Sequence, residues 1–123
     1  MKNSLMAVLI FVLLSVLSVA QAKKQTSTRL PQFSNQQVTV WKTIVYPSST
    51  QAMTMHRHDH NRVVVALTEG TLKITNDKGA VHYMKFEKDK AYYLTKDIPN
   101  ERHNDENLTN HPMKFMVVEL ADN

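Results

Sequence analysis

The chain has 123 residues, enough for a single domain built on one hydrophobic core, and it contains no cysteine, which excludes a disulfide-stapled scaffold. Its 15 lysines and arginines exceed its 11 aspartates and glutamates, for a formal net charge of +4 at pH 7. The basic residues are scattered among acidic ones and form no stripe with aromatic residues, so the composition gives no support for nucleic-acid binding.

The first 22 residues have the layout of a cleavable secretory signal. Lys2 provides a positive start, an uncharged run rich in leucine and valine covers residues 5–19, and Ala20-Gln21-Ala22 forms an A-x-A cleavage pattern. The alternative is a membrane anchor, but the apolar run falls short of the roughly 20 residues that a spanning helix needs. We therefore expect residues 1–22 to be removed and the protein to be exported, to the periplasm or beyond, without a stable membrane anchor.

After the signal, residues 23–37 are polar and weakly patterned, and we expect them to form an extended arm. The chain then changes to short runs of β-forming residues that are broken by turn residues. The sequence Asn76-Asp77-Lys78-Gly79 is typical of a hairpin turn. The predicted strands cover residues 38–46, 51–58, 62–70, 71–75, 80–86, 91–95 and 113–120.

These strands predict the fold class. Outside the signal, no long stretch has the 3.6-residue periodicity of an amphipathic helix. Short strands at fairly regular spacing indicate an all-β sandwich or small barrel over residues 38–121. An immunoglobulin-like sandwich is the second choice, but the chain lacks the cysteine pair of that fold.

Half of the six histidines lie in the segment 56–62, which reads HRHDHNR. Alternate residues of a strand point to the same side with Cα atoms about 6.5 Å apart, so His56 and His58 can converge on one metal ion. His60 shares their orientation if the strand continues regularly. A further ligand has to come from a remote strand, and His103 in IPNERHNDEN is the candidate. The alternative is a solvent-exposed polar strand end.

At these two segments the sequence resembles the cupin family. Cupins carry a first motif G-x5-H-x-H-x3,4-E-x6-G and a second motif G-x5-P-x-G-x2-H-x3-N. The matching residues are His56, His58 and Gly70 in HRHDHNRVVVALTEG, and Pro99, His103 and Asn107 in PNERHNDEN. The resemblance covers most of residues 38–120, and it implies a small antiparallel jelly-roll β-barrel with a ligand site inside.

The first motif departs from the family pattern, because the glutamate ligand is missing. The two permitted spacings from His58 place Arg62 or Val63 at its position, and strand alternation favours Arg62 as the inward residue. If His58 and His60 form the H-x-H pair instead, Val64 takes the glutamate position. Neither register supplies a carboxylate.

The resemblance implies a metal held by three histidines from the set His56, His58, His60 and His103. Such a set suits zinc, iron, nickel or copper, and family members also use manganese. Two unit like charges about 4 Å apart repel by about 4 kcal/mol at a surface-like dielectric, so Arg62 beside the site would disfavour a dication and favour an anionic ligand. The alternative is that Arg62 points away, as a surface residue at a strand edge.

Two further residues are candidates for ligand binding beside Arg62. Asn107 belongs to the second motif, and Tyr93 replaces the glycine that should open that motif. Tyr92 and Tyr93 face opposite sides of one strand, so one of them can line a pocket.

These observations predict an exported small cupin that binds a divalent metal and a small anionic or oxygen-rich ligand. The sequence does not name a reaction, and a catalytic role stays open. The alternatives are a metal-free binding module and a scaffold without enzymatic activity, in which the strands pair with a second copy as a homodimer.

Overall fold

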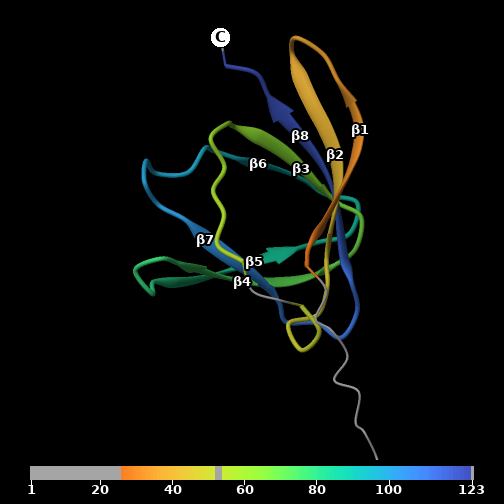
Figure 1. The fold of residues 1–123 in the computed structure, drawn as a ribbon. Coiled ribbons are helices and arrows are strands. Elements are labelled where there is room, and N and C mark those ends of the chain that lie inside the picture. Colours follow the sequence, from red (N-terminus) through yellow and green to blue (C-terminus); the bar gives the residue numbers. More distant parts are fainter. Residues whose placement is uncertain (1–25, 52–53, 123) are drawn as a thin grey trace, which may run out of the picture.

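The computed structural model describes residues 26–51 and 54–122, and these residues form eight β-strands and no helix (Figure 1). The predicted signal, residues 1–22, lies outside the described residues. Within the described part, no helix is long and apolar enough to cross a membrane. The strands are β1 (Thr28–Ser34), β2 (Val38–Val45), β3 (Arg62–Ala66), β4 (Gly70–Asn76), β5 (Val81–Phe86), β6 (Ala91–Leu94), β7 (His103–Asn107) and β8 (Met113–Leu120).

The strands form two antiparallel sheets that face each other. The larger sheet has the order β1-β2-β8-β3-β6, and the smaller one has the order β5-β4-β7. Figure 1 shows the smaller sheet lying across the interior from β8, β3 and β6. This is the small antiparallel jelly-roll barrel that the sequence predicts.

The core fills the space between the two sheets and follows from strand alternation. On β8, Met113, Phe115 and Val117 are buried, and the residues between them are more exposed. Leu72 and Ile74 contribute from β4 in the same way. Burial of each large apolar side chain stabilises the fold by about 1.5–3 kcal/mol, so the alternating residues of β4 and β8 hold the two sheets together.

Of the arm predicted for residues 23–37, the structure describes residues 26–37. Residues 28–34 form β1, which pairs with β2 and becomes an edge strand of the larger sheet. Backbone hydrogen bonds at an edge need no apolar side chains, which explains how a polar segment joins the sheet. The pairing shifts register between Pro31 and Phe33, and an edge strand is where proline is tolerated.

The strand predicted for residues 51–58 is not formed in the part of that segment that the structure describes. The segment has only isolated bridges, one of which pairs His56 with His103. At His58 the backbone instead binds Asp97: the His58 N–H donates to Asp97 Oδ2 at 2.6 Å, and the Asp97 N–H donates to the His58 carbonyl at 2.9 Å. Asp97 thus forms the two hydrogen bonds to the His58 backbone that a neighbouring strand would otherwise form.

The hairpin turn predicted at residues 76–79 is confirmed. Asn76 Oδ1 accepts hydrogen bonds from the backbone N–H groups of Lys78 and Ala80, at 3.0 and 2.8 Å. Gly79 has φ +84°, a conformation that glycine adopts without strain. The turn connects β4 to β5.

Candidate functional site: a histidine cluster in the barrel

Three of the four predicted metal-binding histidines meet inside the barrel. His56 and His58 lie on the connection between β2 and β3, and His103 is the first residue of β7. The backbones of His56 and His103 exchange two hydrogen bonds of 2.8 Å, and one nitrogen from each of the three rings lies within 4.8 Å of the others. His60 is not part of this cluster, because its Nδ1 lies 3.2 Å from Asp122 Oδ2.

Two carboxylates that the sequence analysis missed flank the histidines. Asp105 Oδ2 lies 3.2 Å from His56 Nε2, and Asp105 Oδ1 lies 3.7 Å from His103 Nε2. Asp97 Oδ2 lies 3.3 Å from His103 Nδ1 and also accepts the His58 N–H. Asp105 is two residues after His103 on β7, so the alternation rule that grouped the histidines also identifies this residue.

The electrostatics leave most of the cluster neutral. Burial lowers the pKa of His58 to about 3, helped by the positive charge of Arg62, and burial also lowers the pKa of His103. The hydrogen bond that the His56 ring donates to Asp105 raises the pKa of His56. Burial raises the pKa of Asp105, but the hydrogen bond and charge of His56 outweigh this and hold it below its usual value. Neutral imidazoles can bind a metal.

The histidines open into a cavity of about 490 Å³ between the sheets, a volume within the usual range for small-molecule sites. Its polar lining includes the three histidines, Asp105 and Arg62. Most of the rest is apolar. The apolar lining includes Trp41, Val64, Leu72, Ile74, Phe86 and Phe115.

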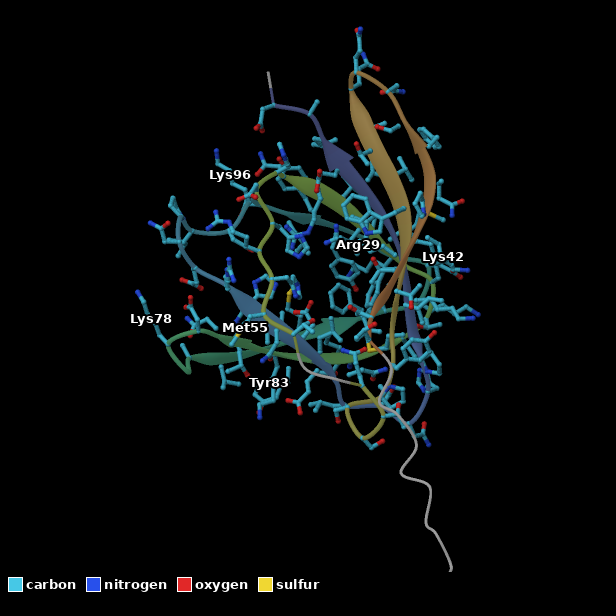
Figure 2. All side chains as sticks on the ribbon, viewed as in Figure 1. Arg29, Lys42, Met55, Lys78, Tyr83 and Lys96 are labelled. Atoms are coloured by element: carbon cyan, nitrogen blue, oxygen red, sulfur yellow. The ribbon has the colours of Figure 1, made fainter. Side chains whose placement is uncertain are left out.

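Two arginines face this cavity. Arg62 faces inward, the orientation that strand alternation favours, with 8% of its surface exposed, and its Nη1 donates to the Thr95 carbonyl at 3.4 Å. Among the described residues no carboxylate lies within 4.0 Å of its guanidinium. Arg29 lies at the rim, with its guanidinium carbon 4.6 Å from the centre of the Trp41 ring. Figure 2 shows Arg29 on the inner side of the larger sheet and Lys42 on its outer side.

The structure places Tyr93 outside the cavity. Its side chain is 60% exposed, whereas Tyr92 packs against the core and accepts the Glu87 N–H through its hydroxyl at 2.8 Å. Adjacent residues of β6 point to opposite faces, so only one of the two tyrosines can face inward. Tyr93, predicted as a ligand-binding residue, therefore does not line this cavity.

Asn107 is fully buried, and its side chain forms its hydrogen bonds with other groups of the protein. Its Nδ2 donates to the carbonyls of Val45 and His111, at 2.9 and 2.7 Å. Its Oδ1 accepts from the Thr109 N–H and hydroxyl, at 2.8 and 2.7 Å. Asn107 does not line the cavity; instead of binding a ligand it joins the end of β7 to β2.

No protein-family model and no curated protein matches the chain in sequence, but solved structures match its fold. A cupin domain from Bordetella pertussis aligns with 83% of this chain and 100% of its own, at 22% identity and a TM-score of 0.68. The Cupin_2 domain of an XRE family transcriptional regulator from Enterobacter cloacae aligns with 84% of this chain and 100% of its own, at 17% identity and a TM-score of 0.56. Fe(II)-HppE with an alternative substrate aligns with 76% of this chain and 49% of its own, at 9% identity and a TM-score of 0.58.

Proposed function

We propose that this protein, which has the cupin fold, binds one divalent transition metal through His56, His58 and His103 and a small anionic ligand beside it. The observation that carries the proposal is the convergence of three imidazole nitrogens within 4.8 Å of one another at the wall of a cavity. An imidazole-metal bond is about 2.0–2.1 Å long, so ligand atoms at such separations can close on one ion with small side-chain movements.

The groups around the histidines fit a metal as well. His56 Nδ1 lies 3.4 Å from the Thr54 carbonyl oxygen, and His103 Nδ1 lies 3.3 Å from Asp97, so on both rings Nε2 is the nitrogen that faces the cluster. Metal-binding histidines usually donate their second ring N–H to a carbonyl or carboxylate, which fixes the ring. Asp105 adds a negative charge that offsets the repulsion between Arg62 and a dication.

The three imidazoles suit zinc, iron, nickel or copper, and a nearby carboxylate extends the set to manganese. When bound, such an ion supplies Lewis acidity to a ligand in the cavity. The chain's own residues hold the ion and, through Arg62, orient the anion. Fe(II) in the structurally similar HppE supports a metal in this fold. The proposal concerns binding, and catalysis would require a substrate that reacts at this site.

The test is the metal content of the purified protein after dialysis against zinc, iron, nickel, copper or manganese. We expect about one ion per wild-type chain and a loss of at least tenfold in affinity for His58→Ala and for His103→Ala. His60→Ala is the matched control, because its ring contacts Asp122 outside the cluster, and it should bind metal like the wild type.

A wild-type protein that holds no more metal than His58→Ala and His103→Ala would contradict the proposal. In that case the alternatives are a metal-free binding module and a scaffold without enzymatic activity. A scaffold that works as a homodimer would show twice the chain mass in light scattering and bind no small molecule.

We also propose export, on the basis of the signal-like residues 1–22. The protein recovered from outside the cytoplasm should then begin at Lys23, which intact mass spectrometry measures. A mass that includes residues 1–22 would contradict cleavage.

A further inference from the structure

We propose that the ligand is an amphipathic monoanion: a carboxylate head that lies between Arg62 and the histidines, and an apolar tail that runs towards Phe86 and Phe115. This inference rests on the proposed function, because it names the chemical class of the ligand at that site. It is carried by the distribution of polar and apolar groups along the cavity and by the one buried arginine.

The larger sheet changes from polar to apolar along the cavity. Arg62, Val64 and Ala66 are the buried residues of β3, and they point to one face in order. In the pairing with β8, Arg62 lies opposite Glu119, and Ala66 lies opposite Phe115. One end of this sheet therefore holds the Arg62 guanidinium opposite the Glu119 carboxylate, and the other end presents the Phe115 ring to the cavity.

The smaller sheet has the same gradient. His103 begins β7, Asp105 follows on the same face and pairs with Ile74 on β4, and Leu72 is the next inward residue of β4. Leu72 in turn pairs with Met84 on β5. The sheet passes from imidazole and carboxylate at one end to aliphatic side chains at the other.

The polar ends of the two sheets coincide, and so do the apolar ends. Asp97 connects the histidines to the β3 side, since it contacts His103 and is two residues from Thr95, whose carbonyl accepts from Arg62. At the other end, the rings of Phe86 and Phe115 meet edge to face with centroids 4.9 Å apart. A ligand that fills the cavity therefore meets a charged region at one end and an apolar region at the other.

Arg62 supplies the contact for the head group. A guanidinium has five N–H donors, and within the described residues its single hydrogen bond is the 3.4 Å contact to the Thr95 carbonyl. A buried cation is costly unless it is paired and hydrogen-bonded. A carboxylate matches the planar fork of a guanidinium with two parallel hydrogen bonds. A bound carboxylate would satisfy this arginine.

Straight-chain monocarboxylates of increasing length test the inference. Acetate, butyrate, hexanoate and octanoate are titrated into the zinc-loaded protein by calorimetry, with 1-hexanol as the probe that lacks the charge. Because each buried methylene contributes about a fourfold gain in affinity, we expect butyrate to bind about 15-fold tighter than acetate and hexanoate about 15-fold tighter again. Hexanol should bind at least tenfold more weakly than hexanoate.

Two variants test which part of the cavity binds the head of the ligand and which part binds its tail. Arg62→Gln should remove the preference for hexanoate over hexanol. Val64→Phe narrows the middle of the cavity, and it should weaken octanoate at least tenfold while acetate binding is kept. Thermal unfolding of both variants checks that they are folded.

The chain-length series on the wild type decides the inference without any variant. Affinity that does not rise from acetate to octanoate, or hexanol that binds as tightly as hexanoate, would overturn it even if zinc binds with one ion per chain. Conversely, a rising series in a protein that binds no metal would refute the metal proposal and leave the ligand class supported.

Discussion

At the scale of single residues, Asp105 does most to explain how the cluster can hold a cation without the glutamate of the first motif. Of the two residues at the permitted spacings from His58, Arg62 is the one that lines the cavity, and it brings positive charge to the site. Asp105 reaches the Nε2 atoms of His56 and His103 from β7. The carboxylate thus comes from the second histidine segment and not from the first.

This role predicts the behaviour of Asp105→Asn. The amide keeps the size of the side chain but loses the charge that offsets Arg62 and the dication. We expect zinc affinity to fall by about 10–100-fold, measured by competition with a chromophoric chelator. Glu106→Gln is the control, because Glu106 is the next residue of β7 and pairs with Lys73 at 3.8 Å outside the cavity. Equal zinc affinity in the two variants would contradict the role.

The sequence predicted His56, His58 and His103 because motif spacing and strand alternation depend only on local order. For Arg62, strand alternation favoured the inward orientation but left a surface position open. His60 shows the limit of this reasoning, since its grouping required a regular strand, and the segment is held by Asp97 instead. Asp97 was missed because its role depends on contacts between segments that are remote in sequence. Asp105 could have been found by strand alternation, because it lies two residues after His103 on β7.

At the scale of elements, backbone pairing makes strands of two segments, β1 and β7, whose side-chain patterns do not predict a strand. β4 and β8 were predicted well, because their alternation of buried and exposed residues is strong. β1 was not predicted, since an edge strand exposes most of its side chains and leaves no apolar pattern to detect. β7 reads HNDEN and is likewise polar, so only its pairing with β4 identifies it as a strand.

Asn107 gives a prediction at this scale, because its side chain connects β7, β2 and the turn before β8. Asn107→Leu removes four hydrogen bonds and takes away the Asn107 partner of the Val45 carbonyl and of the Thr109 N–H. Each buried unpaired group costs about 1–3 kcal/mol, so we expect the free energy of unfolding to fall by about 2–5 kcal/mol. Urea denaturation measures this change. The exposed Asn110→Ala serves as the control, and a Leu variant as stable as that control would contradict the role.

At the scale of the whole molecule, the cavity exists because two sheets are held apart at one end and closed at the other. The apolar end is closed by contacts between β8 and the start of β4. Met113 on β8 is fully buried there, and Gly70 begins β4 against it. The chain passes from one sheet to the other at this point, so close packing around Gly70 fixes how the two sheets meet.

Gly70→Ala tests this closure. An added Cβ would lie 2.7 Å from Met113 Sδ and 2.8 Å from Thr109 Cγ2, and φ of Gly70 is +155°. Thr109 cannot rotate away freely, because its hydroxyl binds Asn107 Oδ1 at 2.7 Å and the His111 carbonyl at 2.9 Å. We expect a loss of about 1–3 kcal/mol from overpacking, in addition to the backbone strain.

Gly79→Ala is the control variant for Gly70→Ala. Gly79 also has a positive φ, +84°, but an added Cβ there meets nothing within 4 Å. Its cost is the backbone term alone, about 1 kcal/mol. Thermal unfolding should therefore rank wild type above Gly79→Ala and Gly79→Ala above Gly70→Ala. If the two variants were equally stable, the contact between the sheets at Gly70 would not be tight, and the closed apolar end that the ligand tail requires would lose its support.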